Sequence, residues 1–388
     1  MKLLSFTLLA LLSTFASAHR PRPNILKRRN PTYSPLAEPS LFNLTSLTDL
    51  SIIDFHEPTS ALSRLLVPRT AGSQNLTDLQ NMVTAHFTRL KWTVEKDTFD
   101  AMTPYGVKTF TNLIFTHDPE ANRRLVLSAH LDSKFFPTHP EDQFVGATDS
   151  AAPCAMMLDV AEGLTGWLDA RRDRILEEGG EEGRETQGET LQIVFFDGEE
   201  AFKMWTGEDS IYGAKCVLFF PFSVPSQLAD SPRRHLASLW SKPTIPPTAS
   251  RPIPPTPISR ISHLVLLDLL GATNPTIRSF YPATGWFFDE FLHAETRLGE
   301  AGFLWDGVAD AQAYSAAKGK VGAKERSFFA PRGAMNGYGG GIEDDHIPFL
   351  KLGVPIVHMI TVPFPRVWHT INASRFAGSW KTDRKSVV

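Results

Sequence analysis

The sequence of 388 residues has few cysteines, little net charge and no long apolar run after its first residues. Its two cysteines, Cys154 and Cys216, leave open whether they pair, but a chain of this length buries enough surface to fold without a disulfide. The net charge of −3 gives no reason to expect nucleic acid as a partner. No segment after residue 18 is long and apolar enough to span a bilayer, so we expect no stable membrane span in the processed chain.

The first 18 residues have the pattern of a secretory signal peptide. Lys2 gives a positive start, residues 3–15 are largely apolar, and residues 16–18 have the small side chains of a cleavage site. The same segment would serve as an anchor if it were not cleaved. Three glycosylation sequons agree with a secretory route, so we expect a secreted glycoprotein. The sequons begin at Asn43, Asn75 and Asn372.

The rest of the chain is expected to form one catalytic α/β domain, over residues 41–376. It follows a flexible arm rich in Pro, Arg and Asn at residues 19–40 and precedes a polar tail at residues 377–388. Two stretches interrupt the expected domain: a low-complexity loop of Gly, Glu and Arg at residues 177–190, and an irregular, Pro-rich insertion at residues 216–260. We expect the protein to be a monomer.

Strands alternate with helices along the domain. Apolar spacing and turn signals predict helices over residues 77–90, 153–167 and 282–298, and strands over residues 92–99, 107–116, 124–128, 193–196, 263–268 and 354–361. Thr77 and Gln80 have capping-box spacing at the start of the first helix. This alternation predicts a three-layer α/β/α sandwich with a mixed, mostly parallel central sheet.

Residues 192–205, QIVFFDGEEAFKMW, are the stretch around which the candidate site is organised. The apolar strand 193–196 ends abruptly in two adjacent carboxylates, Glu199 and Glu200. A buried charge must be paired, bind a metal or change its pKa. An exposed acidic turn would explain the pair if it stood alone, but other strands of this chain end in ionisable groups as well.

These other ionisable groups follow apolar strands or begin helices. Because sites in α/β sheets form where strands end, we expect the groups to converge. Carboxylates and neutral imidazoles suit zinc, and three protein ligands with an open position make a catalytic site. The sequence therefore predicts a zinc hydrolase-like site. The groups are His130, Asp132, Asp149, Asp268, Asp344, His346, His358 and His369.

With these groups, the sequence resembles the glutaminyl-peptide cyclotransferases (glutaminyl cyclases), relatives of the zinc aminopeptidases. The resemblance covers roughly residues 62–370, and it implies a zinc aminopeptidase-like fold. Its motifs are PRTAGS (68–73), TPYGVKTFTNLI (103–114), HLDSK (130–134), GATDSAAPCAMML (146–158), FFDGEEAF (195–202), DSIYG (209–213), LVLLDLLGATNPT (264–276), DDHIPFLKLGVPIVH (344–358) and PFPRVWHT (363–370).

The resemblance implies that N-terminal glutamine of peptides and proteins is cyclised to pyroglutamate with release of ammonia. It implies one zinc per chain, held by Asp149, Glu200 and His369, and a general acid/base at Glu199. The remaining implied site residues are the supporting acids Asp268 and Asp344 and the aromatic pocket walls Trp205, Phe364 and Trp368. The zinc would act as a Lewis acid on the γ-amide carbonyl, and Glu199 would carry a proton from the α-amine to the leaving ammonia.

Two other functions stay open on the sequence. In a di-zinc aminopeptidase, His130 and Asp268 would complete a second metal site and water would be the nucleophile. The second alternative is a catalytically inactive secreted binding protein. The interrupted family segment YGxRHLA supports it, because residues 212–215 and 234–237 are separated here by an unfamiliar run. Glu343 also stands where animal members of the family carry Gln.

Overall fold

The computed structural model describes residues 50–215, 236–243, 256–272, 275–300, 327–332 and 341–371. The predicted leader, arm and tail lie outside the described residues, as do Cys216, two of the sequons and most of the predicted Pro-rich insertion.

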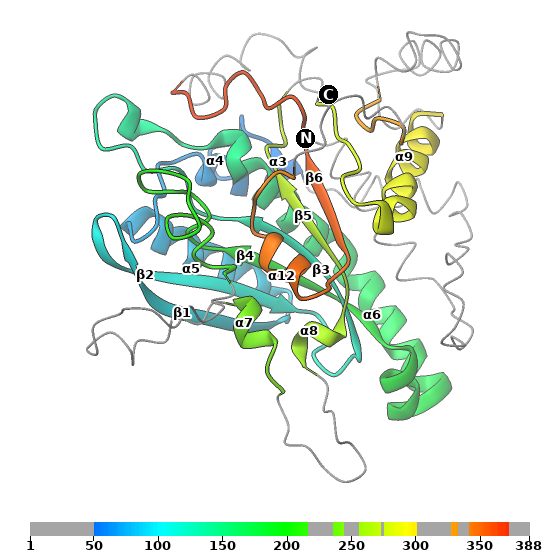
Figure 1. The fold of residues 1–388 in the computed structure, drawn as a ribbon. Helices are drawn as coiled ribbons and strands as arrows, with labels where there is room; N and C mark the ends of the chain where they lie inside the picture. Colours follow the sequence, from blue (N-terminus) through cyan, green and yellow to red (C-terminus); the bar gives the residue numbers. More distant parts are fainter. Residues whose placement is uncertain are drawn as a thin grey trace.

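A six-stranded sheet, in the order β1-β2-β4-β3-β5-β6, forms the centre of the molecule (Figure 1). The pairs β1/β2 and β2/β4 are antiparallel, whereas β4/β3, β3/β5 and β5/β6 are parallel. The prediction of a mixed, mostly parallel sheet is confirmed. The strands are β1 (Thr93–Thr103), β2 (Gly106–Thr116), β3 (Arg123–His130), β4 (Glu189–Phe196), β5 (Ile261–Asp268) and β6 (Ile356–Ile360).

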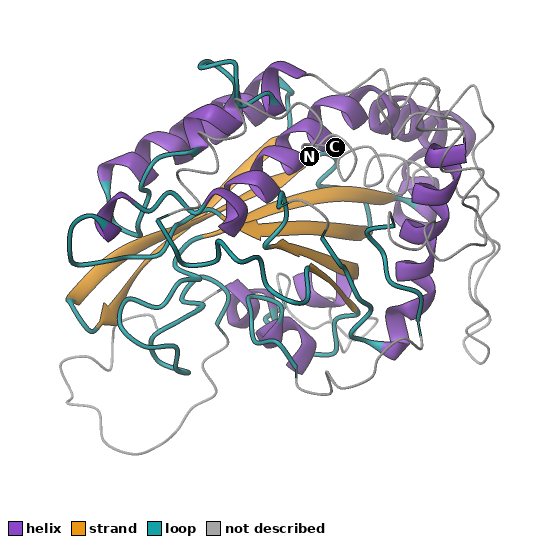
Figure 2. Ribbon diagram, turned by 90° about the horizontal axis from the view of Figure 1, so that it is seen from above, coloured by secondary structure: helices purple, strands orange, loops and turns teal. Residues whose placement is uncertain are grey.

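Helices cover both faces of this sheet (Figure 2). On one face lie α3 (Leu50–Ile53), α4 (Ala61–Leu65), α5 (Gln74–Arg89), α6 (Ala152–Gln187) and α9 (Gly285–Glu300). On the other lie the short helices α7 (Leu236–Trp240), α8 (Pro257–Arg260) and α12 (Ile347–Lys351). Single turns occur at Glu141–Gln143 and Pro282–Thr284, and a π-turn at Ala147–Ala151 leads into α6.

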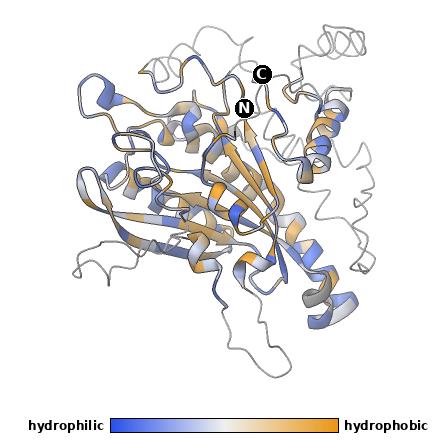
Figure 3. Cartoon of the chain, in the orientation of Figure 1, coloured by the Kyte–Doolittle hydropathy of each residue, from blue (hydrophilic) through white to orange (hydrophobic). Residues whose placement is uncertain are grey.

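Alternation along the strands divides the apolar side chains between two cores. Ile193 and Phe195 of β4 pack with the long helices, whereas Val194 and Phe196 pack with α7 and α12. Because successive residues of a strand point to opposite faces, an uninterrupted apolar run is what a strand buried on both sides requires. In Figure 3 the inner strands are mostly hydrophobic, whereas hydrophilic residues are frequent on the outer helices and loops. The predicted three-layer sandwich is confirmed.

Three local predictions are wrong. Helix α5 begins three residues earlier than expected, because the Ser73 hydroxyl accepts a hydrogen bond from the Leu76 N–H and caps the helix, and Thr77 is not its cap. The stretch 177–190, expected as a low-complexity loop, instead continues α6 as far as Gln187, with Gly180 in a non-helical conformation, and begins β4 at Glu189. The expected irregular region contains the helical turns α7 and α8.

None of the helices in the described part of the chain combines the length and the apolar character that a membrane crossing requires.

Candidate active site

The carboxyl end of β4 makes a tight turn over residues 197–200, and Asp132 holds it. One Asp132 oxygen accepts the Gly198 and Glu199 N–H groups at 2.9 and 3.1 Å, and the other accepts the Glu200 N–H at 3.2 Å. Gly198 has φ +72°, and a Cβ there would lie 2.4 Å from a ring carbon of Phe110. Only glycine fits this backbone, so the turn that aims both glutamates depends on it.

Asp149, Glu200 and His369 come together as a candidate metal group. The His369 Nε2 lies 3.3 Å from Asp149 Oδ2 and 3.2 Å from Glu200 Oε1. Both carboxylates are only 4 % exposed. Burial by itself lowers the pKa of His369, but the two carboxylates raise it to about 9. Three segments far apart in the sequence thus direct two anions and one imidazole at one point, as a divalent cation requires.

A buried arginine fixes the loop that presents Asp149. The Arg69 guanidinium donates to the carbonyl oxygens of Leu131 at 2.7 Å, Gly146 at 3.1 Å and Asp149 at 3.3 Å. It also contacts the carbonyl oxygen of Val145. Because five N–H donors in a rigid plane can satisfy several carbonyls at once, Arg69 stabilises a segment that has no regular hydrogen-bond ladder of its own.

His130 lies behind Asp149 and joins it to Asp268. Its Nε2 is 2.9 Å from Asp149 Oδ1 and 3.5 Å from Asp268 Oδ1, and its Nδ1 donates to the Asp132 carbonyl oxygen at 3.1 Å. The Ser150 hydroxyl donates to Asp268 Oδ1 at 2.6 Å. Burial by itself lowers the pKa of His130, but the charge of Glu199 and these carboxylates together raise it well above its ordinary value. His130, Asp149 and Asp268 form a second group with metal-ligand spacing.

The side chain of Glu199 is 6 % exposed beside other acids. Burial raises the pKa of its carboxyl well above the usual range, and the charges of Glu200, Asp344 and Asp345 raise it further, against the opposing effect of His130. A raised pKa makes a carboxyl group a better proton acceptor than an exposed glutamate, which is the property that a general acid/base needs.

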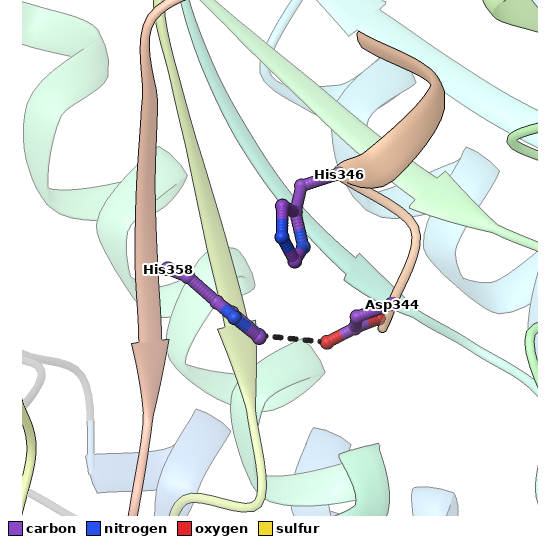
Figure 4. Close-up of side chains that lie close together, drawn as sticks. All are labelled: Asp344, His346 and His358. Atoms are coloured by element: carbon purple, nitrogen blue, oxygen red, sulfur yellow. Dashed lines mark hydrogen bonds and ion pairs between the residues drawn. The ribbon is translucent and has the colours of Figure 1, made fainter. Parts of the chain in front are cut away.

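Asp344 belongs to a third cluster, shown in Figure 4. Its Oδ2 lies 2.8 Å from Nε2 of His358 on β6, and the ring of His346 lies 4.3 Å from that of His358. His346 also contacts the Tyr281 hydroxyl. Burial lowers the pKa of His358 to about 4, so this imidazole is neutral and donates one hydrogen bond to Asp344. The three side chains also have metal-ligand spacing.

Two of the three predicted aromatic wall residues lie beside the metal group. The ring of Trp368 stacks on His369 at 4.1 Å, and Phe364 packs edge-on against Trp368 at 5.0 Å. Trp205 is 38 % exposed, and its indole N–H donates to Glu343 at 3.2 Å, next to Asp344. Two separate loops thus carry the three rings, one beside His369 and the other beside Glu343.

Sequence reasoning assigned no role to Arg69 or Lys134 and no contact to Asp132, although all three lie in quoted motifs. The alternation in HLDSK was the available signal, because polar residues stand at every second position, 130, 132 and 134, after an apolar strand. Apart from the Leu65 carbonyl oxygen, the acceptors of the Arg69 side chain lie more than 60 residues away in the sequence, so no local pattern indicated its role.

Comparison with known proteins identifies a family model and relatives that are similar to this chain. The model of peptidase family M28 matches residues 112–231 and 248–386. The chain is 38 % identical to glutaminyl-peptide cyclotransferase of Bos taurus over 348 residues, which cover 86 % of this chain and 80 % of the relative. It is 35 % identical to the Drosophila melanogaster protein of the same name over 342 residues, 87 % of this chain and 79 % of the relative.

Solved structures of glutaminyl cyclases are also similar to this chain. The crystal structure of Macrostomum lignano glutaminyl cyclase superimposes with a TM-score of 0.63 at 31 % identity, covering 95 % of this chain and 94 % of that one. Porphyromonas gingivalis glutaminyl cyclase, at 20 % identity and a TM-score of 0.52, covers 84 % of this chain and 90 % of that one, and it supports the fold alone.

Proposed function

The chain belongs to peptidase family M28 and to the glutaminyl-peptide cyclotransferases, and from this premise we propose how it cyclises N-terminal glutamine to pyroglutamate with release of ammonia. The observation that carries the proposal is the convergence of Asp149, Glu200 and His369 beside the buried Glu199. The substrates are peptides and proteins with an N-terminal glutamine.

The residues present fit a zinc ion. Two carboxylate oxygens and one imidazole nitrogen are ligands that zinc accepts, and three protein ligands leave a position for substrate. Two ligands about 2.0–2.1 Å from a tetrahedral zinc are about 3.3 Å apart, and His369 Nε2 lies 3.3 and 3.2 Å from its two partners. When bound there, zinc supplies a Lewis acid for the γ-amide carbonyl of the substrate.

We propose one zinc per chain. The second group, His130 with Asp149 and Asp268, would hold another ion in a di-zinc aminopeptidase. In this group the His130 Nε2 lies 2.9 Å from Asp149 Oδ1, which is a hydrogen-bond distance and shorter than the separation of two zinc ligands. This contact supports a positioning role for His130, so that it orients Asp149 and does not bind a metal.

Glu199 carries the proton in the proposed mechanism. Its carboxylate accepts a proton from the α-amine as the amine attacks the γ-carbonyl carbon, and it returns the proton to the amide nitrogen that leaves as ammonia. Because attack is intramolecular, the site has to fold the glutamine side chain back onto its own amine. Restricting two reacting groups in this way can lower a barrier by about 7–11 kcal/mol.

The remaining predicted residues surround this step. Phe364, Trp368 and Trp205 supply the apolar walls for the folded side chain. Trp368 stacks on the proposed ligand His369, Phe364 packs on Trp368, and Trp205 contacts Glu343 next to Asp344. Asp268 and Asp344 support the site from behind: Asp268 is held by Ser150, and Asp344 accepts a hydrogen bond from His358.

Product analysis tests the proposed function. Gln-β-naphthylamide and Leu-p-nitroanilide are incubated separately with the enzyme, and its zinc content is measured. The cyclase releases ammonia and pyroglutamyl-naphthylamide from the first substrate, leaves the second intact and contains about one zinc per chain. Release of nitroaniline with about two zinc ions would establish the aminopeptidase. A folded, zinc-loaded protein inactive on both substrates would support the binding protein.

We also propose a secreted, glycosylated monomer, with residues 41–376 as its one catalytic domain. The leader pattern and three sequons support the secretory route, and Asn75, the sequon asparagine in the described residues, is exposed on the first turn of α5. N-terminal sequencing of the secreted protein should begin at or near His19. Treatment with an N-glycosidase should lower its mass, and light scattering during size exclusion should give the mass of one chain.

A further inference from the structure

Each carboxylate of the proposed metal group uses its two oxygens differently. One oxygen of each, Asp149 Oδ2 and Glu200 Oε1, lies near His369. The other oxygen is held from behind: Asp149 Oδ1 by His130 at 2.9 Å, and Glu200 Oε2 by the Lys134 ammonium at 3.3 Å. The proposed ligands therefore present one oxygen each to the ion and have the second already occupied.

Lys134 is itself held in place. Its ammonium also donates to the Ala201 carbonyl oxygen at 3.1 Å, and its side chain is 20 % exposed. The next residue, Phe135, packs near Phe202 at 5.9 Å, so the segment after β3 is packed against the loop that follows Glu200. A lysine with two acceptors in this loop has less freedom to leave Glu200 than a surface lysine would have.

The motif HLDSK supplies both contacts and the frame between them. His130 ends β3, Asp132 and Lys134 follow at every second position, and all three contact residues of the site. Asp132 holds the backbone of the turn, His130 orients Asp149, and Lys134 orients Glu200. Ser133 connects the same motif to Arg69, because its hydroxyl accepts a hydrogen bond from the Arg69 backbone N–H at 3.0 Å.

We propose that Lys134 is a positioning residue for the metal site: it holds Glu200 with one oxygen directed at the ion and offsets the negative charge of this carboxylate. This inference rests on the proposed function only for the identity of the metal. Residues that orient metal ligands from behind typically change metal affinity by about 10–100-fold when they are removed.

The test is zinc affinity, measured by competition with a chelator of known affinity. Lys134→Met keeps most of the unbranched side chain and removes its charge, and it should weaken zinc binding by about 10–100-fold while circular dichroism and the thermal midpoint without zinc show a folded protein. Lys134→Arg should recover most of the affinity. Lys203→Met, which alters an exposed lysine in the same loop, is the matched control and should bind zinc like the wild type.

A double-mutant cycle separates this role from general structural support. In the background of Glu200→Gln, the further change Lys134→Met should have little additional effect on zinc affinity, because its partner is already altered. Unchanged zinc affinity in a folded Lys134→Met protein, or equal losses in both backgrounds, would overturn the proposal. Because the readout is binding, this result stays distinguishable from failure of the proposed function, which product analysis reports.

Discussion

Asp132 shows how much of the site depends on a residue that touches neither the proposed metal nor the substrate. Its carboxylate accepts three consecutive backbone N–H groups, those of residues 198–200. Hydrogen bonds to a charged acceptor contribute about 1.5–3 kcal/mol each. The turn that carries Glu199 and Glu200 therefore has its position set by one buried side chain.

Asp132→Asn should lower both stability and zinc affinity, because the asparagine NH₂ group cannot accept the N–H groups that one carboxylate oxygen now accepts. We expect a loss of roughly 2–4 kcal/mol in the free energy of unfolding, measured by urea denaturation. Asp142→Asn, at a partly exposed carboxylate, is the control and should change stability by less than about 0.5 kcal/mol. Equal effects of the two substitutions would contradict the role given to Asp132.

Residue types could be predicted at this scale, but their contacts could not. The order of acids and histidines indicated a metal site because carboxylates at the ends of apolar strands need partners. The hydrogen bond between Lys134 and Glu200 joins residues 66 positions apart in the sequence, and that between Arg69 and Gly146 joins residues 77 positions apart. Such pairs depend on how β3, β4 and the loop before α6 lie side by side, which local pattern does not specify.

Among the elements, the turn after β4 is the one with the least freedom to change. Gly198 combines a positive φ with close contact to Phe110. Gly106, in the hairpin between β1 and β2, has φ +91°, but a Cβ at this position would meet no other atom within 4 Å. Alanine substitutions at Gly198 and Gly106 therefore separate the free-energy cost of a positive φ from the cost of steric overlap with a neighbouring side chain.

Gly198→Ala should destabilise the protein by about 1–3 kcal/mol more than Gly106→Ala, because both meet the conformational penalty but only the first overlaps a buried ring. Gly198→Ala should also reduce turnover, since it displaces the two glutamates. Thermal unfolding and steady-state assays measure the two effects. If the two substitutions behave alike, the packing of Phe110 on the turn does not limit the site.

Helix α9 contains a buried acid that makes stability depend on pH. Glu295 accepts hydrogen bonds from the Ser327 hydroxyl at 2.5 Å and the Phe328 N–H at 2.8 Å, and burial raises its pKa to about 7 from 4.5. As pH rises from 4.5 to 7, the unfolded chain loses this proton while the folded protein keeps it. Stability therefore falls over that range and is constant above it.

The corresponding substitution is Glu295→Gln, which keeps an acceptor for Phe328. It should remove a pH-dependent loss of roughly 3 kcal/mol between pH 4.5 and 8, visible as a smaller difference between urea midpoints at these two pH values. Glu290→Gln removes a partly exposed charge from the same helix and should follow the wild type. A wild-type pH profile in Glu295→Gln would show that this carboxyl is already ionised in the folded protein.

Element types were more predictable than element ends. The buried strands β4 and β5 could be identified because continuous apolar runs have few alternatives in a chain of this composition. The start of α5 was predicted at Thr77, whereas the Ser73 hydroxyl provides the cap. The stretch 177–187 was misread as a loop because of its Gly residues, although Glu and Arg are good helix formers and continue α6.

For the whole molecule, the sandwich positions the site at one end of the sheet. The proposed metal ligands follow β4, lie just before α6 or follow β6, and HLDSK continues β3. The parallel strands β3 and β4 end together, so their carboxyl ends bring HLDSK next to the glutamate turn. This convergence could be predicted from strand–helix alternation, whereas the strand order, with β4 between β2 and β3, could not.

The measurement that tests the central claim most directly is turnover of a glutamine-initiated peptide by wild type and Glu199→Gln at equal zinc content. The account predicts that the variant binds zinc and folds like the wild type but forms pyroglutamyl peptide and ammonia about 10²–10⁴-fold more slowly, because only the proton carrier has been removed. Wild-type turnover by the zinc-matched variant would contradict the assignment of Glu199 as the group that moves the proton.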